Sequence, residues 1–298
     1  MHALRPDQFP AMTTEGAMPQ HLTGIDHCVI LVRELDAAAA TWRRLGFTLS
    51  PRGYHSAHMG TANHTIMLQD DYFELLGVVA PTEQNHRFRE EIARGEGLSA
   101  VALQTDDADA ACAEIRGMGM AASDVVAFSR PVDLPGGGQG EAAFRVTHFP
   151  DGLLPGVQLF VCGQLTRDTV WIPELMTHPN GALGLAALVM ACADPSATAA
   201  RWARVFGTAA LAAIDGGVRV DTGKTKVELL APPTLAARYP GVPMDTSRDR
   251  LVGLAIRVAD LGKARAALTA GKAPWRESEG RTIVAPQDAS GTLLEFVA

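Results

Sequence analysis

The sequence contains four copies of one pattern, in which an apolar, strand-like run ends at a polar or acidic residue and an Ala-rich helical segment follows. Such self-similarity indicates that one structural unit is repeated along the chain. When the four runs are aligned, the position of His27 in the first copy is held by Ala100, Ala187 and Gly253 in the others. The runs begin GIDHCVILV, GLSAVALQT, GLAALVMAC and VGLAIRVAD.

Each copy continues with more strand-like segments, of which the last is the clearest. These last segments read DYFELLGV, GVQLFVCG, TKVELLAP and TLLEFVA. A short carboxylate, Asp36, Asp107, Asp194 or Asp260, stands near the start of each helical segment. There it can accept hydrogen bonds from free backbone N–H groups and meet the positive end of the helix dipole. The sequence therefore predicts an α+β fold of four tandem βαβββ modules.

Four such modules, with a histidine in the first strand and a glutamate in the last strand of module one, resemble the vicinal oxygen chelate superfamily. This is the fold of glyoxalase I, bleomycin-resistance proteins and extradiol dioxygenases, and the resemblance covers about residues 22 to 298. The motifs IDH, LGF, GTAN and YFELLG, between Gly24 and Val79, are similar to the glyoxalase-like domain family. The resemblance implies that modules one and two form one cup-shaped lobe, and modules three and four a second.

The expected domain organisation is a flexible tail over residues 1–21, an N-terminal lobe over 22–165 and a C-terminal lobe over 166–298. The lobes should meet near residues 163–184, where prolines and an Asn-Gly pair interrupt regular structure. The tail has no continuous apolar stretch, so it reads as neither a signal peptide nor a membrane anchor.

Composition narrows the kinds of partner. The net charge of −7 and the absence of a basic run argue against a nucleic acid or an anionic membrane surface. Four scattered cysteines suit a reducing cytoplasm. The glycine-rich loop within 131–152 lacks the phosphate-binding pattern, so no nucleotide cofactor is indicated. We expect a small-molecule ligand, with a homodimer as a possible assembly.

The resemblance also implies a metal site, because members of the superfamily take ligands from the first and last strands of paired modules. His27 and Glu74 hold those positions in module one, and Gln158 is the nearest candidate in module two. Imidazole and carboxylate groups suit a divalent ion such as Zn, Mn, Fe, Ni or Co, which could polarise a substrate carbonyl. Ala187 and Gly253 stand where extradiol dioxygenases carry histidines, so that activity is not expected.

The stretch HSAHMGTANHTIML, residues 55–68, adds further candidates. Alternation around a glycine predicts a strand over 55–59, a turn over 60–62 and a strand over 63–68. On this prediction His64 is a third catalytic candidate beside His27 and Glu74. The candidates for substrate contact are His55, His58, Thr61, Asn63, Arg145 and His148. Arg145 is the one suited to a substrate carboxylate.

Each candidate also has a structural interpretation. His27 and Glu74 could form a buried hydrogen-bonded pair without chemistry, and the other histidines could serve only the hairpin. Two functions therefore stay open. One is a cytoplasmic, metal-dependent isomerase or lyase that binds a small oxygenated metabolite and acts beside a carbonyl. The other is a metal-free binding protein that sequesters its ligand, as bleomycin-resistance proteins do.

Overall fold

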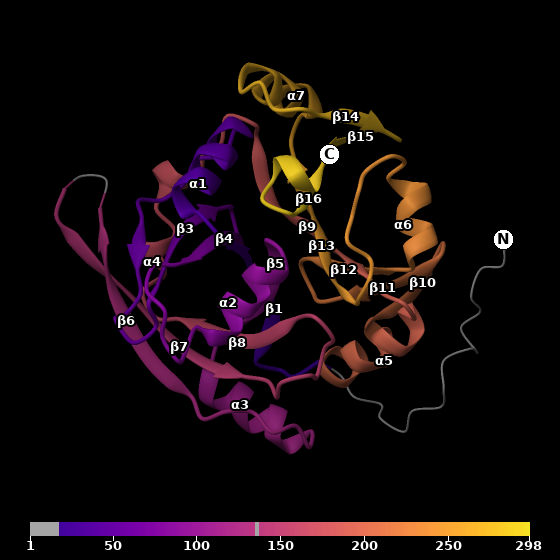
Figure 1. Ribbon diagram of the computed structural model, residues 1–298. Helices are drawn as coiled ribbons and strands as arrows, with labels where there is room; N and C mark the ends of the chain where they lie inside the picture. Colours follow the sequence, from indigo (N-terminus) through magenta and orange to yellow (C-terminus); the bar gives the residue numbers. More distant parts are fainter. Residues whose placement is uncertain (1–17, 135–136) are drawn as a thin grey trace.

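The computed structural model describes residues 18–134 and 137–298, so most of the predicted tail lies outside the described residues. Figure 1 shows two curved sheets beside each other, each with helices on its outer face. The strand orders are β2-β3-β4-β1-β5-β8-β7-β6 and β10-β11-β12-β9-β13-β16-β15-β14. Modules one and two thus share one sheet, and modules three and four share the other. The predicted pairing into two cup-shaped lobes is confirmed.

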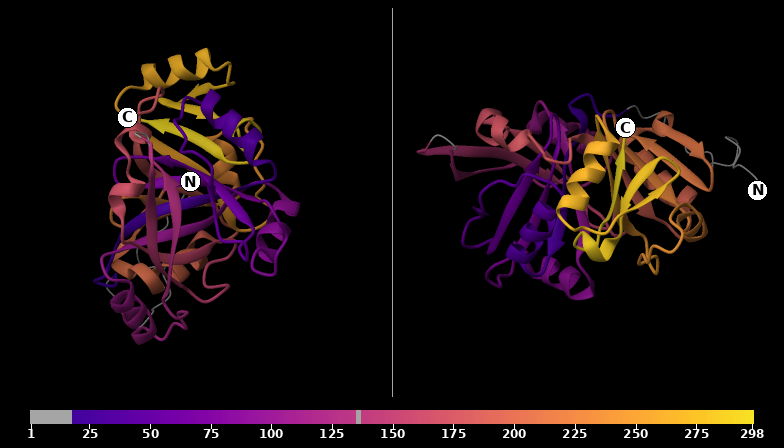
Figure 2. Two further views of the ribbon diagram at one scale, coloured as in Figure 1. Left: turned by 90° about the vertical axis from the view of Figure 1, so that its left-hand side faces the viewer. Right: turned by 90° about the horizontal axis from the view of Figure 1, so that it is seen from above.

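The N-terminal sheet consists of β1 (Leu22–Val32), β2 (Gly53–Tyr54), β3 (Thr61–Met67), β4 (Tyr72–Val78), β5 (Gly97–Thr105), β6 (Val126–Asp133), β7 (Gln139–His148) and β8 (Gln158–Gln164). Its helices are α1 (Leu35–Arg44), α2 (His86–Arg94) and α3 (Ala108–Gly117). Figures 1 and 2 show the long β6–β7 hairpin reaching out from this lobe. Gly137 and Gly138 of the glycine-rich segment lie between the two strands of this hairpin, and residues 135 and 136 lie outside the described part.

The C-terminal sheet consists of β9 (Ala182–Ala191), β10 (Leu211–Ile214), β11 (Gly217–Asp221), β12 (Lys226–Leu230), β13 (Arg250–Val258), β14 (Arg276–Ser278), β15 (Arg281–Val284) and β16 (Leu293–Val297). Its helices are α5 (Pro195–Phe206), α6 (Pro232–Arg238) and α7 (Leu261–Ala270), with short 3-10 turns η3 (Thr208–Ala210) and η4 (Pro286–Asp288). Between the lobes run α4 (Arg167–Val170) and η2 (Pro173–Met176).

Three of the four predicted helix caps are present. The side chains of Asp107, Asp194 and Asp260 each accept a hydrogen bond from backbone N–H groups of the first helical turn. Asp36 does not cap its helix, because α1 begins earlier, after Glu34. Its exposed carboxylate instead forms an ion pair with Arg52.

The segment between the lobes is bonded to module one. The buried ring of His178 accepts a hydrogen bond from the backbone N–H of Thr48 (3.0 Å) through Nδ1, and its Nε2 donates to the carbonyl of Met67 (2.7 Å). Asn180 donates to the carbonyl of Leu45 (3.0 Å). These hydrogen bonds give partners to the backbone N–H of Thr48 and to the backbone carbonyls of Met67 and Leu45. The Pro-Asn-Gly turn is thus an integral part of the N-terminal lobe's packing.

The two lobes also share apolar packing. Phe47 of the N-terminal lobe stacks against Phe296 of the C-terminal lobe, with ring centroids 6.0 Å apart. The indole of Trp42 donates to Ser290 across the same boundary (3.2 Å). No helix among the described residues has the length and apolar character needed to cross a membrane.

Asp71 provides a polar contact between the lobes. Its buried carboxylate accepts hydrogen bonds from the backbone N–H of Leu185 on β9, at 3.0 and 3.2 Å. Burial raises the pKa of Asp71 to about 7, because the single backbone donor and nearby cations compensate the lost hydration only in part.

Asp71 should therefore make stability depend on pH. Between pH 4 and 7 the folded state holds this proton more tightly than the unfolded chain, so the free energy of unfolding falls as pH rises through this range, by up to about 4 kcal/mol. Asp71→Asn keeps an acceptor oxygen but removes the titration. Urea unfolding at pH 5 and pH 8 should show a smaller loss of stability for this variant than for the wild type. The exposed neighbour Asp70→Asn is the control, and an equal pH effect in all three proteins would contradict the assignment.

Candidate functional site in the N-terminal lobe

A β-bulge directs two consecutive side chains of β1 into the cup. Along the antiparallel β1–β5 pair, Ile25 lies opposite Leu103 and His27 opposite Ala102, so Asp26 is an extra residue on β1. Ile25 and Cys28 pack in the core beneath the helices. The bulge therefore leaves both Asp26 and His27 on the concave face, whereas strict alternation would place them on opposite faces.

Asp26 and His27 form a buried pair. The Asp26 carboxylate lies 2.7 Å from Nδ1 of His27 and also accepts a hydrogen bond from the amide of Gln164 at 2.9 Å. A carboxylate only accepts, so Nδ1 carries the proton and Nε2 faces the cup. The ring of His27 stacks on that of Tyr72, with centroids 4.3 Å apart. Asp26 is fully buried and His27 is 5% exposed, so these contacts hold the imidazole in one orientation.

Cys162 on β8 completes a group of three possible metal donors with Asp26 and His27. One ligand atom from each lies within 4.8 Å of the others. Oδ1 of Asp26 is buried and forms no hydrogen bond with any described residue. Burial raises the pKa of the Cys162 thiol well above its ordinary value, and the charges of Asp26 and Glu74 add to this effect. The pKa of Tyr72 is raised for the same reasons.

Glu74 lies on β4, the neighbouring strand, and faces the same cup. It is paired in register with Val29 of β1 and with Thr65 of β3. Its carboxylate accepts a short hydrogen bond from the side-chain amide of Asn63. Glu74 as a whole is 9% exposed, so it is nearly buried.

His55 and Thr61 lie beside this pair. Nδ1 of His55 is 2.7 Å from the Thr61 hydroxyl. Burial lowers the pKa of His55, with Arg130 acting in the same direction and Glu74 opposing it. Burial therefore favours the neutral ring. The structure brings together five of the predicted site residues on module one, namely His27, His55, Thr61, Asn63 and Glu74.

Gln158 does not occupy the position equivalent to Glu74. His27 pairs with Tyr72, and the equivalent Ala100 pairs with Gln158, so Gln158 corresponds to Tyr72. Phe160 is the residue that corresponds to Glu74, and a phenyl ring supplies no ligand. The prediction missed this because the last strand of module two was aligned two residues out of register.

Three other candidates lie away from the cup. His64 faces the helix side of β3, between the core residues Ala62 and Ile66, and its Nδ1 contacts the carbonyl of Ser50 at 2.8 Å. His58 is exposed in a turn. Arg145 faces outward from β7 and forms an ion pair with Asp109 of α3 (2.7 Å). His64 and Arg145 were both predicted on the wrong face of the sheet, because a shift of one position along a strand changes the face on which a side chain lies.

His148 and the predicted hairpin are placed differently. His148 lies at the exposed end of β7, and its ring stacks on Phe160 with centroids 5.5 Å apart. The second strand of module one is only Gly53–Tyr54 and residues 57–59 form the turn, so the third strand begins at Thr61. The predicted strand over 55–59 is therefore wrong. The backbone of His55 still bonds to Thr61 (3.0 Å), which keeps its ring against the sheet.

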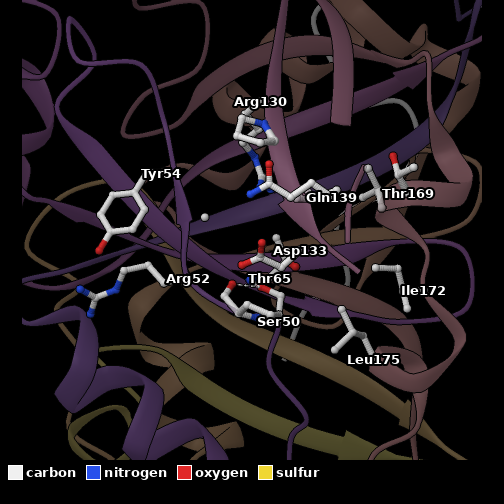
Figure 3. A pocket seen from close by; sticks show the side chains of 15 residues that line it. Ser50, Arg52, Tyr54, Thr65, Arg130, Asp133, Gln139, Thr169, Ile172 and Leu175 are labelled. Atoms are coloured by element: carbon white, nitrogen blue, oxygen red, sulfur yellow. Dashed lines mark hydrogen bonds between the residues drawn. The ribbon is translucent and has the colours of Figure 1, made fainter. Parts of the chain in front are cut away.

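A cavity of about 260 Å³ opens on the concave side between β2, β3, the β6–β7 hairpin and the segment before β9. Figure 3 shows Arg130 and Gln139 of the hairpin on one side of it, with Ser50 and Thr65 across from them and the apolar Ile172 and Leu175 at a third side. Arg130 was not among the predicted site residues. It pairs in register with Ala142, whose side chain is buried on the concave face, and alternation along β6 could have revealed it.

Two segments cover the rest of the cup. Trp171, which follows α4, packs against Tyr72 with ring centroids 5.5 Å apart. Phe88 and Ile92 of α2 pack against apolar residues of β1, β4 and β5 at the other end. The Asp26–His27 pair is therefore shielded from bulk water, and charges near it interact more strongly than they would in water.

The corresponding cup of the C-terminal lobe carries no histidine and is closed by charge pairing. Glu228 and Glu295 are buried at the positions equivalent to Glu74. Arg238 of α6 forms ion pairs with both, and Arg219 and Arg281 add one each. Burial opposes ionisation of Glu228, yet Arg238 and Arg219 hold its pKa below the ordinary value. Both glutamates are therefore salt-bridge partners.

A metal in the N-terminal cup has two possible sets of ligands. The set implied by the fold needs donors from both modules, but Ala100 and Phe160 occupy the two module-two positions. The group Asp26, His27 and Cys162 fits an ion better, because it offers oxygen, nitrogen and sulfur donors and includes an unpartnered buried carboxylate oxygen.

Comparison with solved structures identifies the fold. A hypothetical protein from Staphylococcus aureus shows a TM-score of 0.61 at 12% identity, with 92% of this chain and 98% of that chain covered. A 4-hydroxymandelate synthase mutant from Streptomyces coelicolor shows 0.58 at 11% identity, covering 93% and 92%. A fusion of a xylose isomerase-like TIM barrel with 4-hydroxyphenylpyruvate dioxygenase shows 0.60 at 15% identity, covering 94% of this chain and 49% of that one. The chain has the vicinal oxygen chelate fold.

The family follows from the sequence match. The family described as Glyoxalase-like domain matches residues 25–206, and this chain belongs to it. The match includes both N-terminal modules and the segment around His178 that is bonded to them. No curated protein matches the sequence.

The ion pairs of the C-terminal cup lead to a stability prediction. Replacing Arg238 by methionine leaves two buried carboxylates without their shared cation, and this should lower the free energy of unfolding by about 3–5 kcal/mol at pH 7. Arg219→Met removes a more exposed pair to Glu228 and should cost no more than about 1 kcal/mol. Urea unfolding measures both. Equal, small losses would show that Arg238 does not compensate the buried charges.

Proposed function

We propose that the N-terminal lobe binds a small oxygenated metabolite and catalyses proton transfer at a carbon beside a carbonyl, giving isomerase or lyase chemistry. The observation that supports this most is the arrangement on the concave face. The Asp26–His27 pair on β1 and the Asn63-bound carboxylate of Glu74 on β4 lie on adjacent strands in a shielded cup. The two lobes differ here, because the glutamates of the C-terminal cup are already paired with arginines.

Glu74 is suited to take the proton. One of its oxygens accepts from Asn63, which fixes the orientation of the carboxylate and leaves the other oxygen for the substrate. His27 is suited to a hydroxyl group of the substrate, because its unprotonated Nε2 accepts a hydrogen bond, Asp26 fixes its tautomer and Tyr72 fixes its ring plane. In this scheme Glu74 and His27 have different roles in one reaction.

A divalent ion would be held by Asp26, His27 and Cys162, where it would supply Lewis-acid polarisation of the carbonyl oxygen. With the ion bound, His27 would serve as its ligand, whereas Glu74 would hold the proton and the cup would exclude water in either case. We place the protein in the cytoplasm, where the reduced cysteines are compatible with this role.

Hydrogen exchange tests the reaction. Protein is incubated in D2O with small 2-oxo acids, 2-hydroxy acids and hydroxyketones, and loss of the proton signal beside the carbonyl is followed by NMR. The wild type should exchange at least one compound, and Glu74→Gln should slow this by about 100-fold or more, since a general base contributes this much. Glu83→Gln, an exposed change, is the control.

A second candidate function, ligand sequestration, is favoured by the aromatic side chains Tyr72, Phe160 and Trp171 around the cup. The same experiment separates the two functions. Tight binding of a compound in the panel without exchange would reject the enzyme and leave the binding protein.

The ligand set of the ion is tested by elemental analysis of protein purified without a metal-chelating tag. Near-stoichiometric Zn, Mn, Fe, Ni or Co is expected in the wild type, and it should be lost in His27→Ala and Cys162→Ser. Gln158→Ala should keep the ion, because Gln158 is not part of the donor group. Loss in Glu74→Gln but not in Cys162→Ser would instead support the set implied by the fold. No uptake of any added ion would reject the metal.

A further inference from the structure

We propose that Arg130 binds the carboxylate of the substrate, and that the substrates are small hydroxycarboxylic acids. This inference rests on the proposed function and names its substrate class. It starts from the cavity on the concave side, where Arg130 is a half-buried cation among the lining residues. The backbone of Arg130 is paired within the sheet, but its guanidinium forms no hydrogen bond or ion pair with any other residue of the described part of the chain.

The position of Arg130 distinguishes it from the arginine expected for this role. On β7 Arg145 points to the helix side and is neutralised by Asp109. On β6 Arg130 lies across from Ala142, one of the residues packed on the concave face. A guanidinium in a partly shielded cavity attracts an anion more strongly than one in open solvent, and its planar donors match a carboxylate.

Gly53 links Arg130 to the proposed catalytic residues. A Cβ atom at this position would lie 2.7 Å from Nη1 of Arg130 and 2.6 Å from Oδ1 of Asn63, so both groups lie against the face of Gly53. Asn63 donates through its other amide atom to Glu74. A line of groups thus runs from the cation of Arg130 past Asn63 to the carboxylate of Glu74.

The amide oxygen of Asn63 indicates what the ligand carries besides its acid group. Oδ1 of Asn63 is buried and forms no hydrogen bond with any described residue. An acceptor in this situation costs free energy unless a donor reaches it. A hydroxyl group close to the carboxylate would donate to Oδ1 while the carboxylate lies on Arg130. The other charges lining the cavity are Asp133, which forms no ion pair with Arg130, and Arg52, which is paired with Asp36.

The cavity volume of about 260 Å³ limits the ligand to a small molecule. Its apolar side, formed by Ile172 and Leu175, accepts a short alkyl chain next to the acid. Lactate and 3-hydroxybutyrate have these features, and their primary amides have the same shape without the charge.

Isothermal titration of the full chain with lactate, 3-hydroxybutyrate and the two amides tests the proposal. The acids should bind the wild type at least tenfold more tightly than the amides. Arg130→Gln should weaken binding of the acids by about 10- to 100-fold and leave binding of the amides unchanged, because only the charged hydrogen bonds are lost. Arg130→Lys should recover part of the affinity. Arg145→Gln, which removes an arginine on the opposite face, should bind like the wild type.

Acids that bind no better than amides, acids that bind Arg130→Gln as well as the wild type, or the absence of binding by every probe would each overturn the proposal. Circular dichroism of each variant shows that the fold is kept. The proposed reaction fails separately. Acid binding that depends on Arg130, without hydrogen exchange, would retain this inference and reject proton transfer, whereas exchange of neutral hydroxyketones without acid selectivity would do the reverse.

Discussion

The antiparallel pairing of the first strands of consecutive modules is the interaction on which the rest of the structure depends. β1 with β5, and β9 with β13, join two four-stranded units into one sheet of eight. Each pair contains three register shifts, and two of them place an extra residue beside the position equivalent to His27. These extra residues are Asp26, Ser99, Ala186 and Val252. Only in module one do both positions carry groups that titrate. The joint that forms the cup therefore also orients its acid–histidine pair.

Charge compensation then distinguishes the two cups. A buried carboxylate needs a cation, hydrogen-bond donors or a proton, because burial penalises the ionised form. In the C-terminal cup arginines form ion pairs with Glu228 and Glu295, and one of these arginines, Arg238, comes from α6. In the N-terminal cup the carboxylate of Glu74 is bonded to the amide of Asn63 and forms no ion pair with a described residue, and the guanidinium of Arg130 lines the cavity. The N-terminal cup is therefore the one in which an anionic, hydroxylated ligand would provide partners for polar groups that lack them.

The repeat could be predicted from the sequence, because strand alternation and helix signals recur in every copy. The module pairing and the concave placement of His27 and Glu74 were implied by the resemblance to a known fold. The errors arose where one or two residues change the outcome. A bulge is not visible in an alternation pattern, so Asp26 was missed. Arg130 and Arg145 lie on opposite faces of the sheet, because a shift of one position along a strand changes the face. A register error of two residues led to Gln158 being predicted in place of Phe160. Tertiary packing, which no local pattern contains, places Trp171 over the cup.

The cover over the N-terminal cup also determines how a ligand reaches it. Trp171 and the 165–180 segment are held by the hydrogen bonds of His178 and Asn180 to module one, and α2 covers the opposite end. The cavity beside the β6–β7 hairpin is lined by Arg130 and by Thr65, and Thr65 pairs in register with Glu74. A ligand entering there meets the cation before it meets the carboxylate. Its acid group is therefore bound at the rim, and its hydroxyl-bearing carbon is carried inward toward Asn63 and Glu74.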